Sequence, residues 1–500
     1  MAAAATQVGH PCVSCHAKEV EGFSRSAMAH SLSPADHAPA GAFEHRFSGT
    51  KFTINSVAGE VRQTVERPGL TESLTVQYAI GSGNHAVGYL ARVGDHLFQS
   101  PVAYYTNRGL WDVAPGYEDT PDPDFSRPVT VECLDCHSGK PLEKPDTLNS
   151  YEAPFFAPAA IGCERCHGDP AAHLRSPLPG TIVNPARLSP STRDSVCEQC
   201  HLAGEVRIPN PGKSVADFRP GHPLEDTFTV YVAERRGERT IKVISHSEQL
   251  AQSACARMSG GRLWCGTCHN PHETPVQKAA YYRERCLSCH AATLEPSHAA
   301  RGRDCVACHM PRRNAKDGGH TAFTDHRITR RPEPEGEVAL ANDLAAWREP
   351  ESKLRERNLA LALVTVGMGT NNRDEIIRGY RMLNKVVKQF PNDAPVLTAL
   401  GTIVLTAKET AAAGQYFERA LELRPNYAPY RVNLATALLA EGNTAEAARQ
   451  LEQAVELDPL LEQAVQLLSR VYKMQGQSIK AEELTAKYRA AMGITIGPVK

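Results

Sequence analysis

Residues 42–106 alternate between apolar and polar positions with a period of two, which is the pattern of half-buried strands. The alternation is clear in Val61-Arg-Gln-Thr-Val65 and Leu74-Thr-Val-Gln-Tyr78. Clusters of Gly, Asn, Ser and Pro separate the runs, as expected for turns between strands. We therefore predict a small β-rich unit over about 42–106.

The C-terminal third has a helical pattern that repeats every 34 residues. A proline recurs with this period, at Pro391, Pro425 and Pro459. In the same frame an alanine recurs, at Ala413, Ala447 and Ala481. Small residues at a 34-residue period are typical of tetratricopeptide repeats, in which paired helices cross closely. A generic helical bundle would not need a constant period. We predict three clear repeats and one degenerate copy over 351–492, and a tail at 493–500.

The region between these two patterns is rich in cysteine and histidine rather than in periodic apolar residues. Every cysteine precedes residue 309 and every histidine precedes residue 327. The stretch Arg331-Pro-Glu-Pro-Glu-Gly opposes helix formation and indicates the start of a linker. We predict a first domain over 1–335, a linker at 336–350 and then an all-α repeat solenoid. The expected fold class is therefore mixed, with loops, short helices and a β insertion in the first domain.

Charge and hydrophobicity restrict the possible partners. The chain has 55 Lys and Arg against 56 Asp and Glu, so it lacks the basic excess of a nucleic-acid-binding protein. No stretch reaches the roughly 18 consecutive apolar residues of a transmembrane helix. We expect neither a nucleic-acid partner nor a transmembrane segment.

Fourteen of the fifteen cysteines lie in seven copies of Cys-x-x-Cys-His. Two thiols at this spacing can add to the two vinyl groups of one haem, and the next residue then binds the iron as its proximal ligand. The predicted attachment residues are Cys12, Cys15, Cys133, Cys136, Cys163, Cys166, Cys197, Cys200, Cys265, Cys268, Cys286, Cys289, Cys305 and Cys308. The predicted proximal ligands are His16, His137, His167, His201, His269, His290 and His309. The predicted cofactor is seven covalently attached haem c groups.

Zinc binding is the alternative interpretation of these cysteine pairs. Seventeen residues separate Cys268 from Cys286, which falls within the spacing of a zinc ribbon. Zinc would not require a histidine directly after every second cysteine, and a disulfide framework would not require it either. Since all seven pairs have that histidine, the motif favours haem.

The last three motifs begin at residues 265, 286 and 305, so only about twenty residues separate successive haems. So short a segment cannot build a packed core, and we expect the haems to serve as the core. Cys255 lies outside every motif. It is either a buried thiol or, alternatively, an iron ligand or a redox-active thiol.

Sixth ligands for the irons must come from elsewhere in the chain. Thirteen histidines lie outside the motifs and methionines are scarce in the haem region, so two imidazoles per iron is the expected state. His30 or Met28 is a candidate, although this stretch is equally typical of a short surface helix. His85 follows a glycine-bearing turn, and His173 follows a proximal histidine by six residues. His222 and His246 are ambiguous.

Several motifs together resemble the multihaem cytochromes of the cytochrome c554 type fused to C-terminal tetratricopeptide repeats. The resemblance rests on Gly81-Ser-Gly-Asn-His85-Ala-Val-Gly-Tyr-Leu, Leu263-Trp-Cys-Gly-Thr-Cys-His-Asn-Pro-His272, Cys305-Val-Ala-Cys-His-Met-Pro and His320-Thr-Ala-Phe-Thr-Asp-His326. It implies an exported electron carrier. It also implies distal-ligand candidates, namely His45, His85, His173, His272, His298, His320 and His326. His222 stands where an acidic residue is usual in that group, which weakens it as a ligand.

We therefore predict an exported electron-transfer cytochrome whose repeats bind redox partner proteins or mediate self-assembly. The alternative is a multihaem oxidoreductase with one open-site haem that acts on a small nitrogen or sulfur compound. A scaffold with purely structural haems is a third possibility. Since haem c is attached outside the cytoplasm, we expect a periplasmic or extracellular protein. The start, Met1-Ala-Ala-Ala-Ala-Thr, has no apolar segment typical of a signal peptide, so we expect a processed chain.

Overall fold

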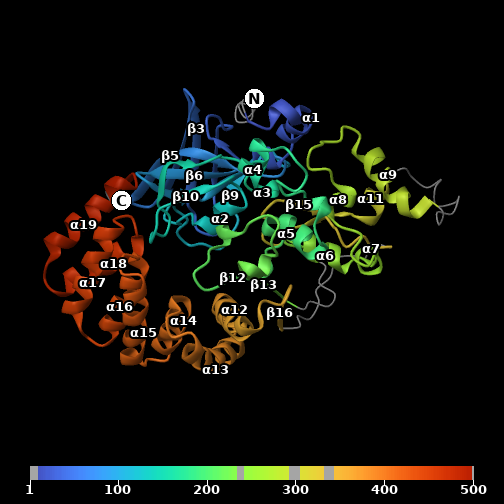
Figure 1. Cartoon of the computed structure of the whole chain (residues 1–500). Helices are drawn as coiled ribbons and strands as arrows, with labels where there is room; N and C mark the ends of the chain where they lie inside the picture. The colour runs from blue at the N-terminus through green and yellow to red at the C-terminus, as the bar shows by residue number, and fades with distance from the viewer. Residues whose placement is uncertain (1–9, 234–240, 292–303, 331–342, 498–500) are drawn as a thin grey trace.

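The computed structural model describes residues 10–233, 241–291, 304–330 and 343–497. A β-sheet near the N-terminus leads into short helices and loops, and a run of longer helices forms the C-terminal third (Figure 1). This arrangement confirms the predicted mixed fold class with a C-terminal helical array. None of the helices in the described ranges is long and apolar enough to cross a membrane.

An antiparallel sheet forms the β-rich unit. Its strands pair in the order β2-β3-β4-β5-β6-β7, and β1 and β17 also pair with β5. Their bounds are β1 (Leu32–Pro34), β2 (Gly41–Glu44), β3 (Lys51–Val57), β4 (Glu60–Arg67), β5 (Leu70–Ile80), β6 (Gly88–Val93), β7 (His96–Gln99) and β17 (Ile494–Ile496). Alternate residues of β3 and β4, such as Phe52 and Val61, are buried, because successive side chains of a strand point to opposite faces.

Four smaller sheets accompany it. These are the pairs β8 (Val102–Tyr105) with β9 (Leu110–Val113), β10 (Pro141–Glu143) with β11 (Tyr151–Phe156), and β14 (Arg312–Asn314) with β15 (Ala322–Thr324), and the three-stranded sheet of β12 (Val206–Pro209), β13 (Phe228–Ala233) and β16 (Leu344–Ala346).

Short helices lie at the Cys-x-x-Cys-His motifs and in the segments between them. They are α1 (Val13–Ser24), η2 (Met28–His30), α2 (Val131–Asp135), α3 (Glu164–His167), α4 (Ala171–Arg175), η3 (Pro185–Arg187), α5 (Pro190–His201), η4 (Val215–Asp217), η5 (Leu224–Asp226), α6 (His246–Gln252), α7 (Ala254–Met258), α8 (Cys265–Cys268), α9 (Lys278–His290) and α11 (Cys305–His309).

The C-terminal region forms four successive helical hairpins after the short η7 (Ser352–Leu354). Their helices are α12 (Arg355–Thr370), α13 (Arg373–Gln389), α14 (Ala394–Thr406), α15 (Thr410–Leu423), α16 (Ala428–Ala440), α17 (Thr444–Leu457), α18 (Glu462–Met474) and α19 (Ser478–Ala491). The periodic alanines Ala413, Ala447 and Ala481 are all fully buried. A side chain at Gly401 would put its Cβ 2.5 Å from Cε1 of Phe417, so only glycine lets α14 and α15 approach this closely.

The first hairpin packs against the three-stranded sheet. Arg357 of α12 donates to the carbonyl oxygen of Pro209 and to both carboxylate oxygens of Asp393. The side-chain amide of Asn358 donates to Asn210 and Thr229, at 3.0 Å each. The sheet also includes β16, which pairs with β13. This strand lies in the segment predicted as a linker, 336–350.

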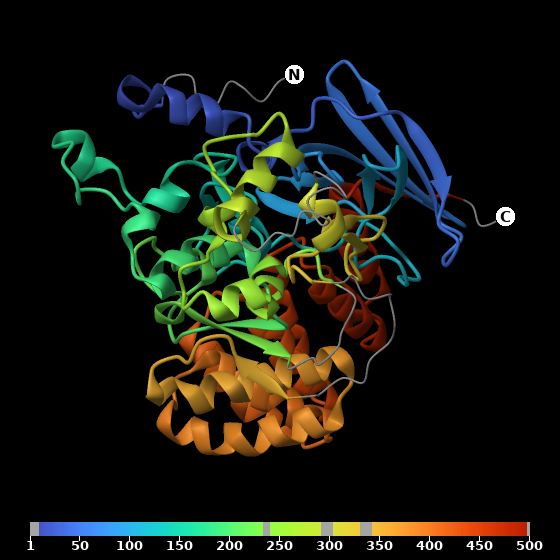
Figure 2. The ribbon, with the colours of Figure 1, turned by 90° about the vertical axis from the view of Figure 1, so that its right-hand side faces the viewer.

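The last hairpin packs against the large sheet. Leu460, Val465, Tyr488 and Met492 join the apolar cluster formed by the sheet. The segment predicted as a tail contains β17, which adds to the edge of β5. The array is thus attached at both ends to the part of the molecule that carries the motifs, and the two views show it as an arc along one side (Figures 1 and 2). Strands of three residues leave too little periodicity in the sequence to be predicted.

Candidate haem-binding site

In α5, α9 and α11 the helical backbone spans a whole motif and brings its three reactive side chains to one side. Residues three and four positions apart lie on the same face of a helix, so both cysteines and the histidine of a motif face the same way. Helices α1, α2, α3 and α8 each contain only part of a motif, and the backbone at His16 and His269 is not helical.

All seven motifs line one continuous cavity of about 3180 Å³. Each motif contributes its histidine and at least one cysteine to the wall. An ordinary small-ligand pocket measures about 300–1,000 Å³, so this space fits several large groups rather than one. The wall also contains apolar side chains, among them Phe23, Ile80, Leu250, Trp264 and Phe323.

Three of the motif helices, α1, α2 and α5, bury side chains in the protein, but other short helices at and between the motifs do not. No residue of α3, α4, α7, α8, α9 or α11 is buried. A helix that buries no side chain gains little hydrophobic stabilisation from the protein alone. A large flat apolar group attached to the thiols would supply that packing, so the residues present fit covalent haem c.

Three pairs of histidines have a spacing suited to a shared iron. Two metal–nitrogen bonds of about 2 Å, with half a ring on each side, place imidazole centroids roughly 6 Å apart. The observed pairs are His16 with His173 at 6.3 Å, His167 with His272 at 5.9 Å, and His269 with His326 at 6.2 Å. Each pair joins a motif histidine to a non-motif histidine, as a proximal and a distal ligand would.

Hydrogen bonds hold several of these rings through Nδ1. Carbonyl oxygens accept from Nδ1 of His167, His309 and His326, at Val183, Thr329 and Thr324 respectively. Nδ1 of His173 is 2.9 Å from the hydroxyl of Thr181. This arrangement fixes the ring and leaves Nε2 for a metal, as is usual for histidine ligands.

Burial keeps the central histidines neutral, which is the form that binds a metal. Burial, with the nearby imidazoles of His326 and His201, lowers the pKa of His269 to about 4. Burial, with His201 and His326 as neighbours, lowers the pKa of His246 to about 3.

Of the predicted distal ligands, four line the cavity: His85, His173, His272 and His326. Three do not: His30, His45 and His320. Both ring nitrogens of His45 are engaged, Nδ1 with Ser48 and Nε2 with the carbonyl of Glu118. Nε2 of His320 is 2.6 Å from Asp112. These contacts oppose an iron-ligand role for His45 and His320. His298 lies outside the described residues.

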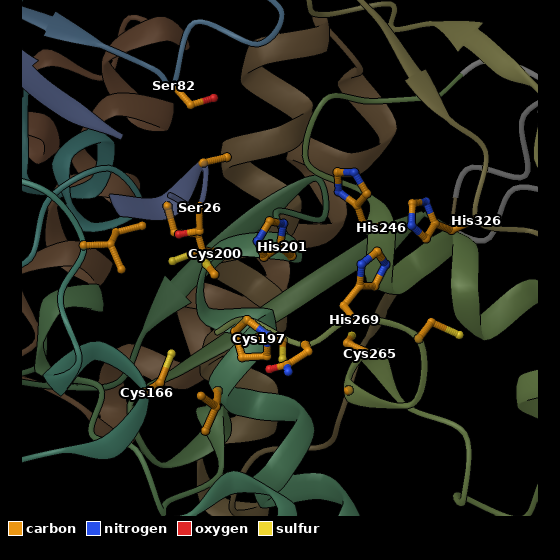
Figure 3. A pocket seen from close by; sticks show the side chains of 18 of the residues that line it. Ser26, Ser82, Cys166, Cys197, Cys200, His201, His246, Cys265, His269 and His326 are labelled. Carbon is orange, nitrogen blue, oxygen red and sulfur yellow. The ribbon is translucent and has the colours of Figure 1, made fainter. Parts of the chain in front are cut away.

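His246 is the cavity histidine that the sequence left ambiguous. It begins α6, and its ring lies among His201, His269 and His326 (Figure 3). The sequence offers no local signal for this role, because the neighbours of His246 come from three distant segments. Cys255 also lines the cavity.

Thiols of different motifs contact one another. The side chain of Cys12 lies close to that of Cys163, Cys136 to Cys200, Cys197 to Cys265, and Cys286 to Cys305. The chain therefore places the first motif beside the third, the fourth beside both the second and the fifth, and the sixth beside the seventh.

The zinc interpretation finds little support in this geometry. Among the described residues, one group of three or more potential ligands lies within metal-binding range, His10 with Cys12 and Cys163, whose ligand atoms are within 4.8 Å of one another. Its two cysteines belong to different haem motifs. The zinc-ribbon pairs considered from the sequence, at 265/268 and 286/289, do not form such a group.

Three family models match parts of the chain. A cytochrome c554 and c-prime model matches residues 119–168, a doubled CXXCH motif model matches 257–295, and a tetratricopeptide repeat model matches 404–468. No curated protein compared with the chain matches it.

Solved structures similar to the chain include those titled "MamA RS-1 ArsTM double mutant" and "MamA 41-end from Desulfovibrio magneticus RS-1". The first is 21% identical, covers 26% of this chain and 74% of its own, and has a TM-score of 0.24. The second is 22% identical, covers 27% and 77%, and has a TM-score of 0.25.

The three family matches agree with the motifs, the shared cavity and the helical hairpins. The chain is a multihaem c-type cytochrome with C-terminal tetratricopeptide repeats.

Proposed function

We propose that this chain is an exported heptahaem cytochrome that carries electrons between redox partner proteins. The observation that supports it most is the single cavity lined by all seven motifs. A bound haem supplies one-electron redox chemistry. The protein's own contribution is to attach the haems, orient the axial imidazoles and bring neighbouring motifs into contact.

The proposed ligand sets follow from the observed pairs. His16 and His173 would hold the iron of the first motif, His167 and His272 that of the third, and His269 and His326 that of the fifth. Two imidazoles per iron favour electron transfer over substrate binding, because they leave no open coordination position. They also give a lower potential than a histidine and methionine pair.

The thiol contacts support three groups of neighbouring sites. The second, fourth and fifth motifs are linked in sequence through Cys136–Cys200 and Cys197–Cys265. The first and third form a group near the N-terminus, and the sixth and seventh form another. Such groups suit a carrier in which an electron passes between neighbouring haems.

Tetratricopeptide repeats mediate protein–protein contacts, and we propose that role for the exposed surface of the array. Both ends of the array are packed against the cytochrome part, so partners would bind its remaining faces. Met474 and Ile479, at the turn between α18 and α19, are apolar residues that remain 64% and 74% exposed.

Intact-mass measurement, redox titration and electron paramagnetic resonance together test the proposed function. We expect a mass corresponding to seven attached haems, stepwise reversible reduction and only low-spin ferric signals. Fewer than seven haems would contradict the haem count. A high-spin haem that binds carbon monoxide when reduced would instead favour the oxidoreductase alternative.

A further inference from the structure

His246 is a half-buried histidine with one ring nitrogen that the protein does not use. Its Nδ1 is buried and has no hydrogen-bond partner among the described residues. A buried ring nitrogen without a partner is costly, so a histidine that serves only packing normally finds one. His45 is such a histidine, with both nitrogens bonded.

The surroundings of His246 consist largely of other cavity imidazoles. Its ring centroid is 5.4 Å from that of His201 and 4.9 Å from that of His326, with Phe323 at 6.3 Å. The separation from His201 is shorter than the roughly 6 Å of two imidazoles on one iron, so a shared haem would move these two rings apart. Figure 3 shows its side chain in the same space as His201, His269 and His326.

Only one motif histidine remains for His246 in this cluster. His326 lies 6.2 Å from His269 with an angle of 31° between the rings, so these two form a pair of their own. His246 and His326 cannot together hold a haem of this type, because neither follows a Cys-x-x-Cys pair. His201 does follow one, Cys197 and Cys200, and its ring contact with a histidine outside the motifs is the one with His246.

We propose that His246 is the distal ligand of the haem attached at Cys197 and Cys200, opposite His201. The proposal rests on the proposed function, since it requires a haem at that motif. The ring planes of His201 and His246 are at 87°, whereas those of the other three pairs are within 31° of parallel. The haem at this motif should therefore give a low-spin resonance signal distinct from those of the parallel pairs.

Replacement of the ligand in the full-length, haem-loaded chain tests this assignment. In His246→Ala we expect one seventh of the haem to convert from low-spin to high-spin and to bind carbon monoxide when reduced. Added imidazole should restore the low-spin state. In His246→Met the same haem should remain low-spin with a raised potential, because a thioether ligand favours the reduced iron. If His246 were purely structural, imidazole would not restore the low-spin state in His246→Ala, and His246→Met would not change the potential.

His222→Ala is the matched control. His222 is an exposed histidine of the same region that lies outside the cavity wall, so its loss should leave all spectra unchanged. To identify the haem, Cys197→Ser with Cys200→Ser removes one attachment, and adding His246→Ala to this variant should create no further high-spin signal.

Two results would overturn the assignment. A His246→Ala chain that carries seven haems by mass and keeps every haem low-spin would show that His246 is not a ligand. If adding His246→Ala to the chain that lacks Cys197 and Cys200 created a new high-spin signal, His246 would be the ligand of a different iron. A missing haem at this motif in the unaltered chain would count against the proposed function instead, and intact mass separates that failure from the other two.

Discussion

The helices of the cytochrome part and those of the repeat array differ in how they bury apolar surface. Each helix of the array buries several of its own side chains, such as Leu400 in α14 and Leu451 in α17. Helices α8, α9 and α11, which carry three motifs, bury none. The array has a core made of protein, whereas around these three motifs we expect the cofactor to supply the core. The difference teaches that burial by protein atoms alone is a poor guide to order in a haem-rich region.

The cytochrome part and the repeat array should differ most in amide protection when haem is absent. We expect a chain produced without haem attachment to lose amide protection in α3, α8, α9 and α11, because these helices bury no side chain in the protein. Helices α14–α17 should keep their protection, since their cluster consists of side chains of the array. Hydrogen exchange followed by mass spectrometry measures both.

His222→Ala is the control for this comparison, because it changes an exposed side chain outside the cavity wall. It should leave exchange unchanged in the haem-loaded chain. Equal loss of protection in both regions of the haem-free chain would show that the array depends on the haems as well.

Asp393→Ala should weaken the contact between the array and the three-stranded sheet. Asp393 is the partner of Arg357, which is 1% exposed and would be left as an unpaired buried charge. Removing one member of a buried ion pair costs about 3–5 kcal/mol. Denaturant unfolding should show this as a lower free energy of unfolding. Asp343→Ala removes the partner of the exposed Arg378, and a change of about 0–1 kcal/mol is expected there.

The interface between the last hairpin and the large sheet should weaken as the pH rises. Burial, with Asp124 as a negative neighbour, raises the pKa of Glu72 to about 8. An unfolded glutamate loses its proton near about pH 4.3, so between that pH and about 8 the unfolded state binds fewer protons and stability falls. The loss is on the order of a few kcal/mol.

Glu72→Gln should flatten the stability profile over this window, and thermal unfolding from pH 5 to 8 measures it. Glu60→Gln, at an exposed position of β4 in the same sheet, should keep the slope of the unaltered chain. A Glu72→Gln profile as steep as that of the unaltered chain would assign the dependence to other groups.

Two glycines of the array should respond to alanine with opposite signs. Gly401→Ala would force a Cβ to within 2.5 Å of Phe417, and overpacking of this kind costs about 1–3 kcal/mol. A Cβ at Gly414, within α15, would lie 4.0 Å from Oε1 of Glu441, which is an ordinary contact, so Gly414→Ala should stabilise the chain by about 0.5–1 kcal/mol. Thermal unfolding midpoints distinguish the two, and a stabilised Gly401→Ala would refute the close crossing of α14 and α15.

The cytochrome nature of the chain, its mixed fold class and its helical repeats could be predicted because each depends on short-range patterns. A Cys-x-x-Cys-His motif is complete within five residues. The tetratricopeptide period is visible in the constant 34-residue spacing of Ala413, Ala447 and Ala481. The attachment of the array could not be predicted, because β16 and β17 are too short to leave a periodic signal and pair with strands far away in sequence.

The sequence by itself determined where haem can be attached and which histidine follows each attachment site, because those groups are neighbours in the chain. Tertiary structure decided which other histidines face the cavity. His45 and His96 are engaged by Glu118 and Asp458, while His246 lies beside His201 from 45 residues away in sequence. A distal ligand needs only to reach the face of the haem opposite the proximal imidazole, and any loop can place it there. Only the packing of distant segments selects which one does.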